Sequence, residues 1–149
     1  MSIYLRAVLL GLATGGRSTV GITALALTAP RTGSWLGNRW LTRAAGLASA
    51  GELAGDKLPK APSRLAPPGL VSRLAFGVIG GMLLARRYRA STSTMVLAAL
   101  LTVAAAVAGA LLGGRWRSLV ARRLGTDLPG ALLEDAGWLA VARYAVTAR

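Results

Sequence analysis

The stretch Met95 to Leu112, MVLAALLTVAAAVAGALL, decides the fold class because it holds no charged residue over its whole length. A helix that crosses the hydrocarbon core of a bilayer needs roughly 20 mostly apolar residues. Arginines flank the run on both sides, and the Ala and Leu that dominate it favour helix. We therefore expect a membrane-spanning helix over residues 95–112.

Four other segments of the chain are apolar over a comparable length, and they cover residues 4–29, 35–58, 70–84 and 129–146. The segment 35–58 is the weakest, because Arg39, Arg43, Glu52 and Asp56 leave only a short clean stretch in it, residues 44–51. No segment shows the ten-residue alternation of a membrane barrel strand. The sequence predicts an all-α, polytopic membrane helix bundle with four to five membrane segments, forming a single integral membrane domain over residues 1–149.

The composition favours a bilayer over water. Hydrophobic residues make up 54% of the chain and charged residues 15%, whereas about a quarter of the residues of a soluble domain are charged. The net charge is +13, and the basic residues cluster at the ends of apolar runs, where anionic lipid headgroups lie. We expect a multi-pass protein of a bacterial plasma membrane, with anionic lipids rather than nucleic acid as partners. The basic residues divide almost evenly between the two expected sides, so the positive-inside rule gives no orientation.

The chain has no Cys and no His. This excludes disulfides and thiolate chemistry, and it removes the commonest general base and metal ligand. Carboxylates holding a metal could still hydrolyse a lipid, but no nucleophile motif and no acidic motif of metal-binding spacing is present. We expect no enzymatic activity, no metal site and no cofactor.

Glycines recur at a spacing of four residues, at 11/15, 33/37, 51/55, 77/81 and 109/113. Small residues on one face let membrane helices approach closely, either within one chain or at the seam of a homo-oligomer. The stretch Gly11–Arg17 also matches Gly109–Arg115 at every Gly and at the Arg. This match suggests two related halves, a plan found in transporters.

Acidic residues are rare, and four of the five fall within or beside apolar segments. A charged group at the centre of a bilayer costs about 2.5–3.5 kcal/mol, which makes such residues candidates for a functional site. Glu52 and Asp56 share a helix face, and Lys57 follows them as a possible partner. Glu134 and Asp135 diverge by about 100°, so that one can face the bundle while the other points elsewhere. Their place in the first turns after Pro129 also suits the helix dipole without any function.

Arg17 lies within Thr14-Gly-Gly-Arg-Ser-Thr19, near the middle of the first apolar segment. The two glycines can break the helix there, and the hydroxyls can bond the freed backbone groups. The N-terminus of a half-helix beside an arginine would suit an anionic group. We expect a buried salt bridge between Arg17 and one of the four acids.

Three short motifs resemble an uncharacterised family of small bacterial membrane proteins, known only as a domain of unknown function. They are Gly15-Gly16-Arg17, Glu52-x-x-x-Asp56-Lys57-x-Pro59 and Pro129-x-x-x-x-Glu134-Asp135. The resemblance implies a multi-helix membrane fold but no activity. It marks as residues to test Arg17, Glu52, Asp56, Lys57, Glu134 and Asp135.

The leading hypothesis from the sequence is a transporter or channel for an ion or small solute. Glu52 and Asp56 would bind a cation or carry a proton, Glu134 and Asp135 would contribute from the second half, and Arg17 would balance their charge or hold an anionic group. The alternative is a non-catalytic accessory or assembly subunit of a larger membrane complex. Convergence of these charged residues around a polar cavity would favour transport, and their dispersal to the membrane interfaces would leave the acids with no role beyond the helix ends.

Overall fold

The computed structural model describes residues 1–30, 35–55, 67–126 and 128–148, and every regular element in these ranges is a helix. The order is α1 (Ile3–Gly16), α2 (Val20–Leu27), the short 3-10 helix η1 (Trp35–Gly37), α3 (Arg39–Gly55), α4 (Pro67–Arg87), α5 (Thr92–Leu124) and α6 (Leu128–Thr147). The all-α prediction is confirmed for these residues. The predicted site residues Asp56 and Lys57 lie outside the described ranges.

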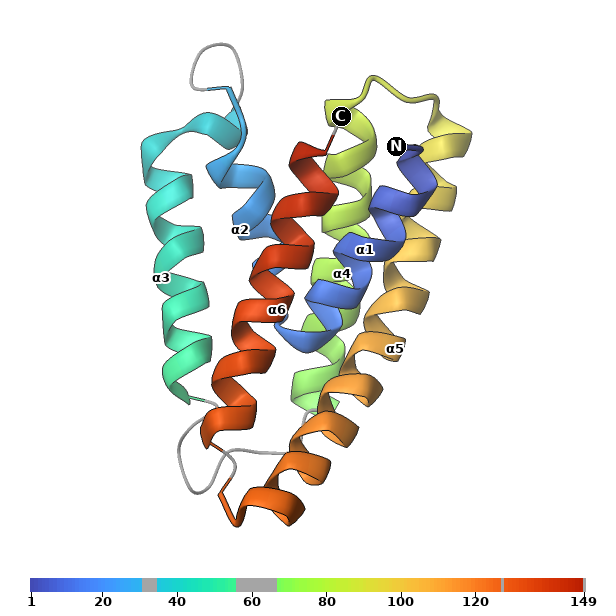
Figure 1. The fold of residues 1–149 in the computed structure, drawn as a ribbon. Helices are drawn as coiled ribbons and strands as arrows, with labels where there is room; N and C mark the ends of the chain where they lie inside the picture. Colours follow the sequence, from blue (N-terminus) through green and yellow to red (C-terminus); the bar gives the residue numbers. More distant parts are fainter. Residues whose placement is uncertain (31–34, 56–66, 127, 149) are drawn as a thin grey trace.

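The first apolar segment forms a helical hairpin instead of one continuous helix (Figure 1). After α1 ends, Arg17 is extended (φ −142°, ψ 112°) and α2 returns toward the end of the bundle from which α1 came. Two contacts fix this return. Gly21 of α2 lies against Thr14 of α1, and Arg87 at the end of α4 donates to the hydroxyl of Thr28 just after α2, at 2.7 Å. Residues 4–29 are therefore not the single spanning segment that their apolar run predicts.

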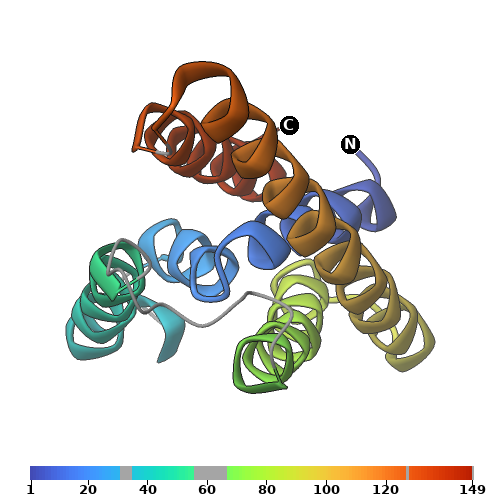
Figure 2. The same cartoon turned by 90° about the horizontal axis from the view of Figure 1, so that it is seen from below.

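The hairpin occupies the centre of the bundle, as the view along the helices shows (Figure 2). Helix α1 packs on α4, α5 and α6, while α2 packs on α3, α4 and α6. The helices α3 to α6 alternate in direction, so both chain ends and the connection between α4 and α5 lie at one end of the bundle (Figure 1). This arrangement places the break between α1 and α2 inside the bundle.

Glycines bring α1 and α5 into backbone contact. A Cβ at Gly15 would collide with the carbonyl oxygen of Ala106, and a Cβ at Gly109 would collide with that of Leu12. These glycines are thus used for packing within the chain. The two stretches that match in sequence cross each other here, but the first ends a helix while the second lies inside α5. The match therefore does not correspond to the same local structure.

Two of the described helices are long and apolar enough to cross a bilayer, namely Gly69–Arg87 within α4 and α5, with mean hydropathies of 1.4 and 2.5. This is fewer than the four to five segments that the sequence predicts. Helices α1 and α3 have only 14 and 17 residues, and α6 carries three charged residues. In the two candidate spans 39% and 33% of the apolar window is buried, and the rest is half-buried or exposed.

Arg6 closes the end of the bundle that holds both termini. Its side chain is 5% exposed, and its Nη1 donates to the carbonyl of Ala145 at 3.1 Å. Its Nη2 donates to the carbonyl of Ala148, and its guanidinium carbon lies 4.6 Å from the centre of the Tyr88 ring. A cation is favourable at the C-terminal end of a helix, so Arg6 ties α1 to the last turn of α6.

Candidate functional site

The carboxylate of Glu52 caps the break between the two arms of the hairpin. The first amides of a helix have no acceptor within it, and here the N–H groups of Ser18 and Thr19 donate to Glu52 Oε1 and Oε2 at 2.8 and 3.0 Å. The hydroxyls of the same two residues donate to the same two oxygens, both at 2.8 Å. A side chain of α3 thus supplies a negative charge to the N-terminus of α2, where the helix dipole favours it.

Arg17 and Asp135 form a buried ion pair between the hairpin and α6. Nε of Arg17 lies 2.7 Å from Oδ1 of Asp135, and Nη2 lies 2.5 Å from the same oxygen. Arg17 is 2% exposed and Asp135 is 6% exposed, so the two charges are almost wholly removed from water. Nη1 of Arg17 also donates to the backbone carbonyl of Glu52 at 3.4 Å. The salt bridge expected for Arg17 is present, and it is made with Asp135.

Arg73 of α4 binds the other side of the break. Its Nε donates to the carbonyl of Gly15 in the last turn of α1, at 2.9 Å, and its Nη2 lies 4.0 Å from Oε1 of Glu52. The two half-helix ends therefore each meet a charge of the favourable sign, since a cation lies at the C-terminus of α1 and an anion at the N-terminus of α2. We call Arg17, Glu52, Arg73 and Asp135, with Ser18 and Thr19, the polar centre.

A row of hydroxyls leads away from Glu52 between α2 and α3. Thr19 Oγ1 shares a hydrogen bond with Ser49 Oγ at 2.9 Å, and Ser49 Oγ shares one with Thr23 Oγ1 at 2.8 Å. Thr23 Oγ1 lies 3.0 Å from the carbonyl of Ala45, to which it can donate. In this row Thr23 can donate to Ser49, Ser49 to Thr19, and Thr19 to the carboxylate of Glu52.

Glu134 precedes Asp135 on α6 and is hydrogen-bonded to Trp138. Its carboxylate accepts a hydrogen bond from Nε1 of Trp138, one turn along α6, at 3.0 Å. Both Glu134 and Asp135 are buried, although their side chains diverge. This is possible because α6 packs on α1 and on α5, so that two directions from it lead into the bundle.

Four of the six residues that the sequence singles out lie in the described ranges, and printed contacts join three of them, Arg17, Glu52 and Asp135. The sequence reasoning missed Arg73, although an arginine inside the apolar segment 70–84 is as costly there as an acid. It also missed the hydroxyl row, because Ser and Thr are common in membrane helices for other reasons. In the described part of the chain, no three acidic side chains gather to form a metal site.

No protein-family model, no curated protein and no solved structure matches this chain. The family suggested by the three motifs stays a prediction.

Proposed function

We propose that this chain is a small multi-pass protein of a bacterial plasma membrane that moves an ion or small solute across the bilayer, with the polar centre on its pathway. The observation that carries the proposal is the broken helical hairpin whose tip meets charges from three other helices. Of these, Arg73 and Asp135 are buried and Glu52 is half-buried. Discontinuous helices with their ends directed at a polar site near mid-membrane are characteristic of secondary transporters. Irregular backbone at membrane depth persists only inside protein or beside a wet cavity.

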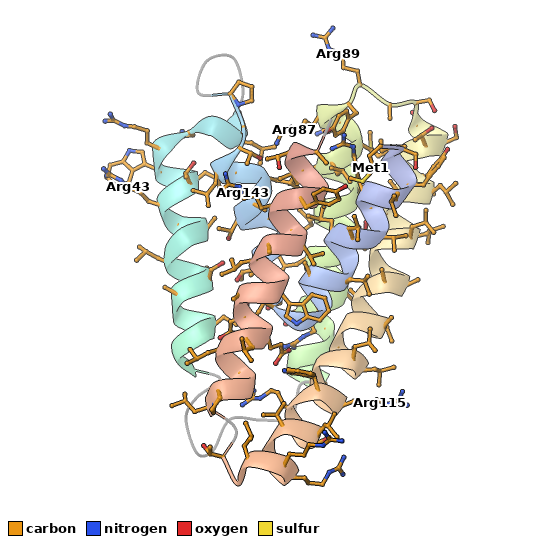
Figure 3. The ribbon with its side chains drawn as sticks, viewed as in Figure 1. Met1, Arg43, Arg87, Arg89, Arg115 and Arg143 are labelled. Atoms are coloured by element: carbon orange, nitrogen blue, oxygen red, sulfur yellow. The ribbon has the colours of Figure 1, made fainter. Side chains whose placement is uncertain are left out.

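The surface of the bundle supports the membrane location. Apolar side chains of α4 and α5 point outward along much of the length of both helices, including Val78, Ile79, Leu97 and Leu100. Soluble monomers rarely expose continuous apolar surface of this kind. Charged side chains gather at the two ends instead, with Arg43, Arg87, Arg89 and Arg143 toward one end and Arg115 toward the other (Figure 3). In this arrangement α3 to α6 cross the bilayer and the α1–α2 hairpin is re-entrant.

The tip of the hairpin then lies deep in the hydrocarbon core. Helix α1 has 14 residues, which at a rise of about 1.5 Å per residue reach roughly 20 Å into a core about 30 Å thick. Charges at that depth are expensive unless they are paired. The polar centre holds two positive and two negative charges, so its net charge is zero. This neutrality lowers the cost of placing it in the hydrocarbon core, although the site remains polar.

Glu52 is the proposed proton- or cation-binding residue. As a carboxylate it holds four donors at the break; once protonated it has less acceptor capacity, and the bonds that join α3 to the tip of α2 weaken. The hydroxyl row of Thr19, Ser49 and Thr23 offers a proton path toward one end of the bundle. Arg17 and Asp135 neutralise each other, and Arg73 lies near the charge of Glu52. Asp56 and Lys57 stay candidates for the same pathway.

Flux in proteoliposomes tests the proposal. The purified chain, as a monomer or a homo-oligomer, is reconstituted with a pH-sensitive dye inside, and a panel of inorganic ions and small solutes is presented outside. Wild type should show flux with at least one of them, and E52Q should reduce it at least tenfold. R143Q, which removes an exposed charge far from the polar centre, should leave it unchanged. Absence of flux for every solute, or equal flux in E52Q, would contradict the proposal.

One observation favours the alternative, an accessory or assembly subunit. Every charge in the polar centre has a partner of opposite sign, and a purely structural network would show the same pairing. Purification in a mild detergent separates the two cases. A second protein that stays bound in fixed stoichiometry would favour the accessory subunit, and an isolated stable bundle would favour transport.

A further inference from the structure

An apolar groove lies between α5 and α6 on the outside of the bundle, and no residue of the polar centre lines it. Its volume is about 520 Å³, and it is lined by leucine and valine side chains and by the rings of Trp116 and Trp138. Gly137 borders it, and a Cβ at this position would meet no atom within 4 Å. The groove is therefore open space that no part of the described chain fills.

The two tryptophan walls of the groove are fixed in place. Trp116 Nε1 donates to the carbonyl of Gly130 at 3.1 Å, and Trp138 Nε1 donates to the carboxylate of Glu134 at 3.0 Å. Both indoles thus have their polar atom satisfied by α6, and apolar ring surface of both lines the groove. Such a preformed apolar site of a few hundred Å³ is typical of ligand pockets.

The rim of the groove is positively charged. Arg115 lines it, and Figure 3 places this side chain toward the lower end of the bundle. The basic residues Arg117, Arg122 and Arg123 follow on α5. The acid in the lining, Glu134, is buried and bonded to Trp138. An apolar groove that ends at a cationic rim is complementary to an anionic amphiphile with a hydrocarbon chain.

We propose that this groove binds an anionic glycerophospholipid, with one acyl chain between Trp116 and Trp138 and the phosphate on Arg115. Clusters of basic residues at the membrane surface favour anionic headgroups, and interfacial tryptophans flank acyl chains. A second copy of this chain would have to place its own strongly basic surface against Arg115, which like charge disfavours. The site is connected to the polar centre, because Trp138 also packs against Gly16 at the tip of the hairpin.

Fluorescence quenching by brominated lipids tests the site directly. In a W35F/W40F background only Trp116 and Trp138 report. Brominated phosphatidylglycerol should quench them at about fivefold lower mole fraction than brominated phosphatidylcholine, and R115Q should remove this preference. R143Q, at the opposite end of the bundle, should keep it. Equal quenching by the two lipids in the W35F/W40F protein would overturn the proposal.

Filling the groove gives a second, charge-independent test. G137F places a ring into open space, while G114F is a matched control, because Gly114 is also a helical glycine with nothing within 4 Å but does not line the groove. G137F should abolish the preference for phosphatidylglycerol, and G114F should retain it. An unchanged preference in G137F, or a dimer in the wild type that G137F converts to monomer by light scattering, would overturn the proposal.

Discussion

The carboxylate of Glu52 on α3 accepts a hydrogen bond from the backbone N–H of Ser18, 2.8 Å away, at the point where the first helix of the chain breaks. This contact joins two parts of the chain that are 34 residues apart. It also explains how an interrupted helix persists inside the bundle, since the freed amides find a charged acceptor there.

Replacing Glu52 by Gln should lower the free energy of unfolding by about 2–3 kcal/mol, because hydrogen bonds to a charged acceptor are lost at the break. Ser49→Ala is the matched comparison, since it removes only bonds between neutral groups and should cost about 1 kcal/mol. Both can be measured by denaturant titration in detergent. Equal losses for the two variants would mean that the charge of Glu52 contributes nothing to the hairpin.

The pair of Arg17 and Asp135 should behave as one unit in a double-mutant cycle. Arg17→Met or Asp135→Leu alone leaves a buried charge without its partner and should cost about 3–5 kcal/mol. The double variant should recover most of that loss, because both buried charges are gone. Additive losses in the double variant would show that the two side chains do not depend on each other.

Gly15→Ala should destabilise the fold by about 2–3 kcal/mol, because the added methyl group meets the backbone of α5 at Ala106. Gly114→Ala, on the same pair of helices but with open space around it, should stabilise the chain by about 1 kcal/mol through helix propensity. Thermal unfolding followed by circular dichroism distinguishes the two. Stabilisation by both substitutions would contradict the close crossing of α1 and α5.

Arg6→Gln should loosen the last turn of α6 while leaving the polar centre intact, since Arg6 donates to the carbonyls of Ala145 and Ala148. Hydrogen exchange should rise in the peptide that ends α6 and stay unchanged around residues 49–52. Faster exchange over the whole bundle would show that Arg6 supports the global fold and not only this end.

Much of the helical structure could be predicted from the sequence. The runs 70–84, 95–112 and 129–146 fall inside α4, α5 and α6, because length and hydropathy decide whether an apolar run becomes a helix. The end of α5 could not be placed, because the uncharged run ends at Leu112 before the flanking arginines, whereas the helix continues to Leu124. Single glycines are tolerated inside a helix when the flanking residues favour it.

The break after Gly16 could be predicted, but its direction could not. The hydropathy of residues 4–29 does not distinguish a kinked spanning helix from a helical hairpin. The chain reverses because of tertiary contacts, such as that of Gly21 with Thr14. The partners of Glu52 were equally hidden, because two of its four donors are backbone N–H groups, which no residue pattern identifies. The ion pair of Arg17 was predictable in kind, since a buried arginine needs an acid, but not in its choice of Asp135.

Sidedness of the two arms tests the central claim, that the first two helices form a re-entrant hairpin with its tip inside a membrane. The chain has no Cys, so single-cysteine variants report without background. Labelling with a membrane-impermeant maleimide in oriented vesicles should reach S2C, A29C and A90C from one side, and T126C from the other. Labelling of S2C and A29C from opposite sides would contradict the hairpin.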